Sequence, residues 1–465
     1  MESYYPGSVF VYTDSWRYVL PRLLVRFRAG RVFRKLKSPR DILVFRVDGI
    51  KFGDLVYDSV LRNGYATISS LDGRVLQALY AYFWYRYVIK DIIRRYKIET
   101  SVFSHIIGLG SGIFARYLLQ SGVEVLNRTG SHQLQVKKYQ NVDEVGFYPL
   151  RPEPRYFSFM MNRRDNAILQ RADKYLHNRL NQNVRHIAVD LAFDRRKRFF
   201  SSREEFCSHF GLDPAKKLIF VMLHAFNDYP HSHFAQPMIY QDYFDWFQKT
   251  LEVAKSLDSV NWIFKEHPAA EFYQTKDVSL DTIFEGVKHS HIRFLNRQAD
   301  FNSRSLQYIA DAIVTCLGTA GLEYSCLGIP CVLAGESPYS GFGFTIEPRS
   351  ALEYRERLRH IDKLKQLSEN QIKAAKIVMF FQLSMIQGDS YLFCPIYDFR
   401  QIKEIRADDL WKNAAELMKT GDKAKMARQI ETLSEFIRDA SYTQYISLEK
   451  YGFMEEAVHG GQQPK

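Results

Sequence analysis

The chain has 465 residues and a formal net charge of +12, with 46% hydrophobic and 25% charged residues. This length exceeds one ordinary hydrophobic core, so we expect two domains, and the composition excludes a disordered or fibrous protein. Because we find no secretory signal and no uncharged apolar run of roughly 18 residues, we expect a cytoplasmic protein. Cysteine spacing favours a reducing compartment over a zinc or disulfide framework, since no CxxC pair occurs among Cys207, Cys316, Cys326, Cys331 and Cys394.

Residues 1–40 form a basic amphipathic N-terminal segment. Between Arg17 and Arg40 lie nine basic residues and no acid, interleaved with apolar side chains. Such a segment either lies on the anionic surface of the inner membrane or forms a solvated helix that packs its apolar face on the first domain. We expect no nucleic-acid partner, because no recognised nucleic-acid motif accompanies the charge.

Residues 41–195 are expected to form a first Rossmann-like domain, because strand and helix patterns alternate along them. Alternation at this spacing favours parallel pairing of the strands. The expected elements are a strand at 42–47, helices at 55–62 and 76–96, a buried strand at 101–107, a helix at 113–120 and a strand at 123–126.

Residues 196–395 repeat the alternation as a second Rossmann-like domain, and residues 396–465 are expected to be a helical tail that packs back on both domains. The fold class is therefore predicted as α/β, with two domains facing a cleft and helices at the C-terminus. The second domain has expected strands at 218–223, 262–265, 292–295, 312–316 and 330–334, with helices at 243–257, 305–310 and 320–327.

The first candidate site is Asp311–Glu323, where a buried strand runs into Gly318 and opens a helix. Free amides at the start of a helix attract phosphate or carboxylate, so Gly318, Thr319 and Ala320 are candidate ligand-binding residues. Glu323, one turn further on, can accept hydrogen bonds from ribose hydroxyls. A plain strand–turn–helix packing unit also explains the glycines, and this alternative stays open.

The second candidate is Phe264–Pro268, at the carboxyl end of a strand, where open α/β sheets bind their ligands. Pro268 makes the turn rigid and presents His267 reproducibly. His267 can then donate to a nucleotide phosphate and stabilise a departing group, and Lys265 can assist. The alternative is a loop histidine without a function.

The third candidate is Leu223–His231, directly after the first strand of the second domain. His224, His231 and His233 near Asp228 permit a metal site, but their spacing matches no helical ligand pair, so we expect no metal. Asp228 is instead predicted to face the cleft as a nucleophile or a general base. A loop-capping aspartate is the alternative.

The three motifs are expected to converge on one crevice, because each follows a strand of the same sheet. A glycine-rich loop at Ala334–Gly343 follows the next strand. Its residues Tyr339, Ser340 and Gly341 are predicted either to close over a bound sugar or to form an exposed turn.

In combination, these motifs resemble bacterial surface-polysaccharide glycosyltransferases, and in particular the retaining β-Kdo transferases of capsule and O-antigen (lipopolysaccharide) assembly. The resemblance is carried by His224–Asp228, His267-Pro268, Gly318–Glu323 and Tyr339–Gly341, and it extends to Val47–Asp58 in the first domain. It implies a GT-B fold, with residues 41–195 as the acceptor domain and 196–395 as the donor domain. It covers about Asp41 to Arg349.

The resemblance implies that Kdo is moved from CMP-Kdo to a surface-polysaccharide or lipid-linked glycan acceptor, without a metal. His267 would contact the CMP phosphate, with His224, Lys265 and Pro268 beside it, and Gly318, Thr319 and Ala320 would cradle the donor. Asp228 would attack the anomeric carbon, which gives net retention. Histidine-proline pairs also occur in sialyltransferases and in polyol-phosphate transferases that use CDP donors, so an inverting enzyme with Asp228 as base stays open. So does a non-catalytic nucleotide-sugar-binding subunit of a polysaccharide assembly complex.

Overall fold

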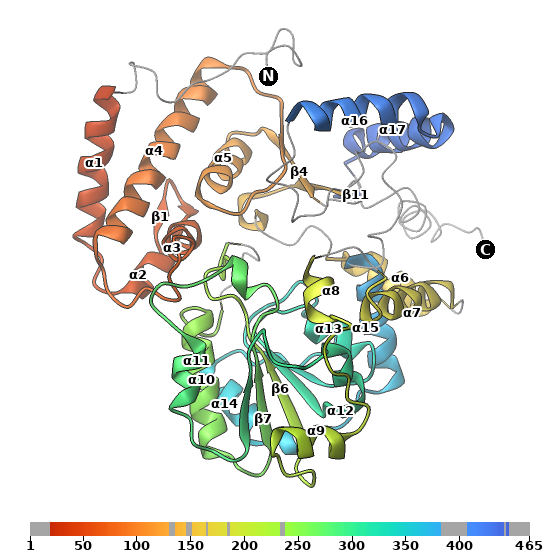
Figure 1. The fold of residues 1–465 in the computed structure, drawn as a ribbon. Helices are drawn as coiled ribbons and strands as arrows, with labels where there is room; N and C mark the ends of the chain where they lie inside the picture. Colours follow the sequence, from red (N-terminus) through yellow and green to blue (C-terminus); the bar gives the residue numbers. More distant parts are fainter. Residues whose placement is uncertain are drawn as a thin grey trace.

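The computed structural model describes residues 19–129, 135–145, 151–163, 166–183, 187–232, 238–382, 407–440 and 443–445. They form two α/β units, which Figure 1 shows one above the other. His233, Cys394 and the first 18 residues of the basic segment lie outside the described residues. No helix among the described residues is both long and apolar enough to span a bilayer.

The C-terminal unit is built on a parallel five-stranded sheet with the order β10-β9-β6-β7-β8. From the central strand β6 the chain moves to one edge and then returns to build the other side, which is the order of a Rossmann half. The strand order reverses between β6 and β9, and the crevice of such a sheet lies there. The strands are β6 (Leu218–Met222), β7 (Asn261–Lys265), β8 (Ile292–Leu295), β9 (Ala312–Thr315) and β10 (Cys331–Leu333).

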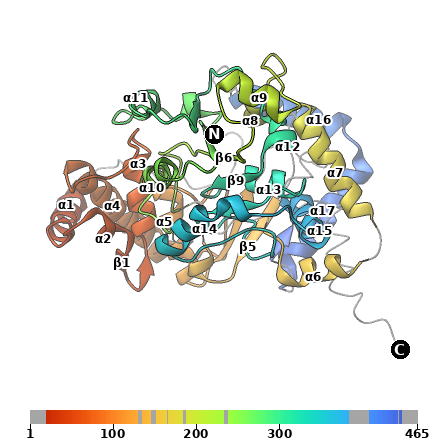
Figure 2. The ribbon, with the colours of Figure 1, turned by 90° about the horizontal axis from the view of Figure 1, so that it is seen from below.

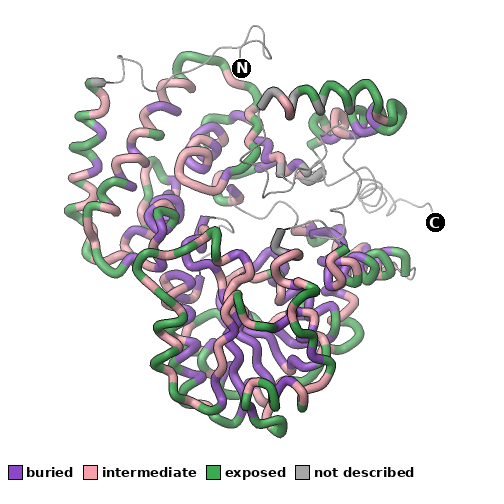
Figure 3. Tube along the Cα trace, in the orientation of Figure 1, coloured by how far each residue is buried: buried purple, intermediate pink, exposed green. Residues whose placement is uncertain are grey.

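Helices cover both faces of this sheet, so its strands are buried on both sides (Figures 2 and 3). Alternate residues of β6 point to opposite faces: Leu218 and Phe220 join one core, while Ile219 and Val221 join the other. The first core includes residues of α9 (Arg203–Phe210), α12 (Leu306–Ile309), α13 (Ala320–Ser325) and α15 (Glu369–Gln382), and the second includes residues of α10 (Tyr243–Ser256) and α14 (Ala351–Arg359), with α11 (Leu280–Glu285) packed against it.

The N-terminal unit has a smaller, mixed sheet with the order β11-β5-β4-β3, in which only β3 and β4 pair in parallel. Its last strand comes from near the C-terminus of the chain, so the tail returns to the first unit. The strands are β3 (Thr100–Phe103), β4 (Glu124–Thr129), β5 (Gln135–Tyr139) and β11 (Gln444–Tyr445). The helices are α1 (Val19–Phe33), α2 (Pro39–Leu43), α3 (Gly53–Leu61), α4 (Gly73–Arg95) and α5 (Leu109–Gln120), with α16 (Ala407–Thr420) and α17 (Lys423–Arg438) in the tail.

The predicted α/β class, with two α/β units and C-terminal helices, is confirmed, and the Rossmann strand order is seen in the C-terminal unit. The strand predicted at 42–47 is wrong. Pro39 and the hydrogen bonds that the Ser38 amide and hydroxyl donate to the Asp41 carboxylate start a short helix there instead. A hairpin follows, β1 (Arg46–Val47) with β2 (Ile50–Lys51), whose Asp48-Gly49 turn has positive φ at both residues.

The strand predicted as buried at 101–107 is short and lies at the edge of its sheet, with Val102 68% exposed. The segment 151–195 contributes α6 (Pro154–Asn162), α7 (Ala167–Leu180) and α8 (Ile187–Ala192). Both α6 and α7 pack against α15 of the C-terminal unit, because their apolar faces join its core.

The two units meet at a buried polar joint around α3. The Asp58 carboxylate of α3 accepts hydrogen bonds from the backbone amides of His231, at 3.0 Å, and Ser232, at 2.6 Å, and from the Ser232 hydroxyl, at 2.7 Å. The Tyr57 hydroxyl donates to Asp242, the residue that caps α10, over 2.7 Å. Since Asp58 and Tyr57 are fully buried, these bonds between the units are shielded from water.

Candidate functional site

A cavity of about 110 Å³ lies at the carboxyl ends of β6, β7 and β9, at the reversal of strand order. Most of the residues singled out in the sequence line it together, although they come from three separate loops. They are His224, Lys265, His267, Pro268, Gly318, Thr319, Ala320 and Glu323. The structure therefore brings together the motifs after β7 and β9 and, from the motif after β6, His224, whereas Asp228 does not line this cavity.

Lys265 ends β7 and is 8% exposed. Burial, reinforced by the nearby Lys197, lowers the pKa of Lys265 to about 8. Within the described part of the chain, its ammonium has no hydrogen-bonding or ion-pairing partner. A mostly buried lysine whose ammonium has no protein partner is stabilised by an anion beside it, so Lys265 favours an anionic ligand.

His267 is held as a neutral hydrogen-bond donor. Its Nδ1 accepts from the backbone amide of Ala269 over 3.2 Å, which leaves the ring proton on Nε2. Burial, with a contribution from Lys265, lowers the pKa of His267 to about 4, so the ring is uncharged at neutral pH. The turn that Pro268 fixes therefore brings an imidazole donor to the same cavity as the Lys265 ammonium.

His224 has a positioning role. Its Nε2 accepts from the backbone amide of Leu317 over 3.0 Å, and its ring stacks on Tyr243 with 4.2 Å between the ring centroids. Burial lowers the pKa of His224 to about 3. The ring thus fixes the start of the glycine turn that follows β9.

The glycine turn after β9 combines packing with free donors. A Cβ on Gly318 would meet the Thr315 hydroxyl oxygen at 2.8 Å, so packing alone requires glycine there. The backbone amides of Thr319 and Ala320 donate to no group in the described residues, and both residues line the cavity. Since α13 has only six residues, these two amides matter more than a helix dipole.

The Glu323 carboxylate forms an ion pair that the sequence did not reveal. Arg179 of α7 donates to the Glu323 carboxylate through Nε at 2.8 Å and Nη2 at 2.7 Å, and both side chains are buried. Arg179 also lines the cavity. It comes from a helix 144 residues away in sequence, so strand-end motifs gave no signal for it.

The glycine-rich loop is part of the interior. Tyr339 and Ser340 are 1% and 2% exposed, and the Tyr339 hydroxyl donates to the carbonyl of Gly318. The expectation of an exposed turn is therefore wrong for these two residues, because apolar packing and this hydrogen bond fix them, while closure of the loop over a sugar stays a prediction. Gly341 is exposed, and none of the three lines the cavity.

Asp228 does not line this cavity and lies beside the first unit. Its carboxylate forms an ion pair of 3.9 Å with Arg62, which follows α3. Burial raises the pKa of Asp228, and Arg62 opposes the shift. The neighbouring His231 bonds the carbonyl of Gln241 through Nε2 at 2.8 Å. No group of three or more His, Cys, Asp or Glu suited to a metal occurs among the described residues.

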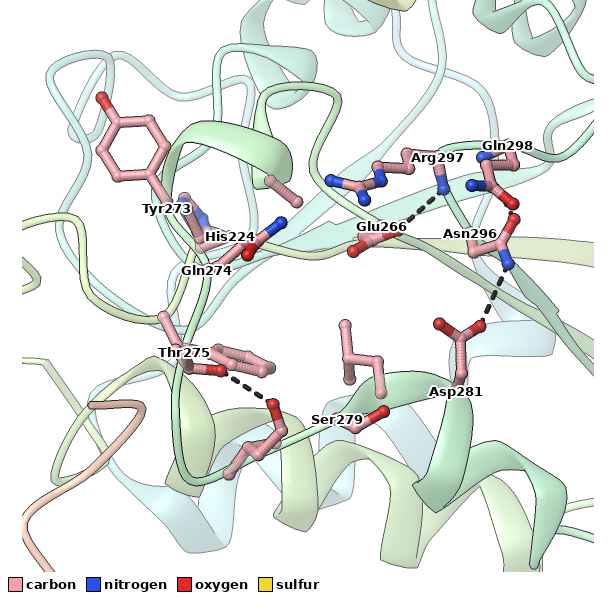
Figure 4. Close-up of a pocket in the computed structure, with 15 residues that line it drawn as sticks. His224, Glu266, Tyr273, Gln274, Thr275, Ser279, Asp281, Asn296, Arg297 and Gln298 are labelled. Atoms are coloured by element: carbon pink, nitrogen blue, oxygen red, sulfur yellow. Dashed lines mark hydrogen bonds between the residues drawn. The ribbon is translucent and has the colours of Figure 1, made fainter. Parts of the chain in front are cut away.

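A second cavity of about 320 Å³ shares His224 and Glu266 with the first (Figure 4). Glu266 accepts from the backbone amide of Arg297 over 2.7 Å, and Asn296 donates to Asp281 over 3.0 Å. Asn296 and Arg297 directly follow β8, so the strand-end rule that located His267 would also have located them. The two cavities adjoin along the carboxyl edge of the sheet, and the larger one has the more polar lining.

Fold and site thus define a Rossmann-type α/β protein with a cavity at the topological switch point, lined by Lys265, His267 and the turn after β9. No protein-family model and no curated protein matches the sequence. Solved structures similar to it include two of Thermosulfurimonas dismutans KpsC, a β-Kdo 2,4 transferase and a β-Kdo 2,7 transferase. The first is 13% identical to this chain, and the match covers 60% of this chain and 78% of the KpsC chain. The second is 14% identical, and the match covers 63% of this chain and 80% of the KpsC chain. Both have a TM-score of 0.33.

A third similar structure is the UDP-GlcNAc 2-epimerase of Methanocaldococcus jannaschii, in complex with UDP-GlcNAc and UDP. It is 10% identical, covers 67% of this chain and 81% of its own, and has a TM-score of 0.28. At these scores the three likenesses establish neither a family nor a function.

Proposed function

We propose that this protein is a glycosyltransferase whose C-terminal unit holds the phosphate of a nucleotide sugar in the smaller cavity. The observation that carries the proposal is Lys265: its side chain is mostly buried, its ammonium has no protein partner among the described residues, and it lines the same cavity as the His267 donor. A phosphate group supplies what both side chains lack: negative charge and several acceptor oxygens. The larger cavity takes the polar remainder of the ligand.

The same groups suit departure of a phosphate. As the bond from the anomeric carbon to the phosphate oxygen breaks, negative charge grows on the nucleotide. Lys265, the His267 Nε2–H and the amides of Thr319 and Ala320 are donors already fixed in place, so they stabilise this charge with little reorganisation. His267 does so as a neutral donor, because its lowered pKa keeps the ring unprotonated at neutral pH.

The finer proposal is a cytidine nucleotide donor, with Kdo as the sugar, and Asp228 as the nucleophile that gives retention. It is supported by the resemblance of the His267-Pro268 and Gly318–Glu323 motifs to β-Kdo transferases. The ion pair of Asp228 with Arg62 gives further support, since it holds the carboxylate next to the unit that would carry the acceptor glycan. The anomeric configuration of the product distinguishes this role from that of a general base.

A thermal-shift screen against CMP, CDP, UMP, UDP and GDP tests the proposal. We expect one nucleotide to raise the melting temperature selectively, because a ligand that binds only the folded state stabilises it. Lys265→Ala should abolish this shift, whereas Lys255→Ala, which removes an exposed lysine on α10, should retain it. No stabilisation by any of the five would contradict nucleotide binding, and binding without transfer of sugar to any glycan would favour the non-catalytic subunit.

A further inference from the structure

Helix α1 lies at the outer edge of the N-terminal unit and packs against α4 (Figures 1 and 2). The inner face of α1 packs against the rest of the unit. Val25 and Ala29 are 2% and 0% exposed. The guanidinium groups of Arg22 and Arg26 stack over the rings of Trp84 and Tyr80 of α4, at 5.1 Å and 5.7 Å.

The outer face of α1 carries an apolar stripe that nothing in the described structure covers. Leu20, Leu23, Leu24 and Phe27 are 76%, 62%, 65% and 66% exposed. Their spacing of three, four and seven residues places them on one side of the helix. Single exposed leucines are ordinary, but four large apolar side chains on one stripe indicate a surface that meets an apolar partner.

The charges beside this stripe define the second property of the partner. Arg28, Arg31 and Arg34 are exposed and form no ion pair with any described residue. Arg31 and Arg34 continue the side of the helix that carries the stripe, because they follow Phe27 by four and seven positions. No acidic residue occurs between Arg17 and Arg40, and the next one in the sequence is Asp41. A partner for this face must therefore offer an apolar region for the stripe and negative charge for the arginines.

We propose that the outer face of α1 docks on an anionic lipid bilayer, with the helix lying in the plane of the interface. The stripe enters the boundary between headgroups and acyl chains, and the three arginines bind lipid phosphates. The α1–α4 contact stays intact, since none of its inward residues is needed. This contact is independent of the proposed nucleotide site, because the two share no residue.

Vesicle sedimentation of the full chain tests this docking. Wild type should bind vesicles of phosphatidylcholine with about 30% phosphatidylglycerol and bind pure phosphatidylcholine weakly, with affinity falling as salt rises. The Leu23→Ser, Leu24→Ser, Phe27→Ser triple variant should bind at least about tenfold more weakly. Each of Arg28→Gln, Arg31→Gln and Arg34→Gln should weaken binding roughly fivefold.

The matched control is Leu352→Ser, which removes a leucine that is 63% exposed on α14 and should leave binding unchanged. All replaced residues are exposed, so the melting temperature should stay close to that of wild type, and nucleotide-induced stabilisation should be unaffected. Equal sedimentation of wild type and the triple variant would overturn the proposal. A wild-type dimer that the triple variant converts to a monomer, without vesicle binding, would assign the stripe to a second copy of the chain.

Discussion

Two buried polar regions of this molecule differ in one respect: at the joint between the units the Asp58 carboxyl is satisfied by hydrogen bonds, whereas in the cavity the Lys265 ammonium has no partner among the described residues. Asp58 at the joint accepts three hydrogen bonds across the boundary. Lys265 in the cavity is comparably buried, yet its ammonium has no partner in the described residues. A folded chain satisfies its buried polar groups for stability, so groups left without partners in a cavity point to a ligand.

The largest expected effect concerns the joint. Asp58→Ala removes the acceptor of three buried donors, so we expect the free energy of unfolding to fall by roughly 3 kcal/mol or more. Thermal unfolding should show a melting temperature lower by several degrees, while Asp258→Ala, at an exposed turn, should show no change. If Asp58→Ala melts at the wild-type temperature, the hydrogen bonds of the joint contribute no stability, which contradicts the contrast drawn between the joint and the cavity.

Next comes the cavity lysine, where function and stability should move in opposite directions. Lys265→Met removes a charge-assisted contact, so the affinity for the nucleotide selected by the screen should fall about 10- to 100-fold. Its stability without ligand should stay equal or rise, because a buried unpaired charge is removed. Calorimetric titration and urea unfolding measure the two quantities. A loss of stability with unchanged affinity would make Lys265 a structural residue.

The pH dependence of binding sharpens the same contrast. Below pH 8 the Lys265 ammonium is protonated before the ligand arrives, since its pKa is about 8. Above pH 8 the proton must be taken up on binding, so affinity should fall by up to about tenfold between pH 7 and pH 9. A nucleotide sugar is the suitable probe, because its phosphodiester stays ionised throughout. Lys265→Met should bind equally at both pH values, and a parallel pH dependence in that variant would assign the effect to another group.

The smallest effect belongs to His267, a neutral donor. His267→Ala should weaken nucleotide binding about 2- to 10-fold, as expected for one neutral hydrogen bond. His267→Gln keeps an N–H donor and should recover part of that loss. If the alanine and glutamine variants bind equally, His267 makes no hydrogen bond to the ligand.

The C-terminal unit was predictable because its strands are buried on both faces and its motifs follow strand ends. His267, Lys265 and Gly318 were located in this way, since parallel strands end at one edge of a sheet. Asn296 and Arg297 obey the same rule and were missed only because their loop has no glycine or proline signature. By contrast, the pairing of Glu323 with Arg179 depends on packing between distant segments, which no local pattern encodes.

The first unit was less predictable because local hydrogen bonds decide its start. Ser38 and Asp41 cap a helix where an apolar run suggested a strand, and Asp48-Gly49 turns the chain back at once. Tyr339 was misjudged for a related reason. Its loop is rich in glycine, but the hydroxyl bonds Gly318 and the ring fills the core. Glycine content alone does not distinguish a free loop from one that packs closely.

The most direct measurement is a crystal structure of the protein with the nucleotide that stabilises it most. We predict a phosphate oxygen within hydrogen-bonding distance of the Lys265 ammonium and of the His267 Nε2, with the rest of the ligand extending along the edge of the sheet toward Glu266. A phosphate bound elsewhere on the protein, with Lys265 still unpaired beside an empty cavity, would contradict the proposed role of this site.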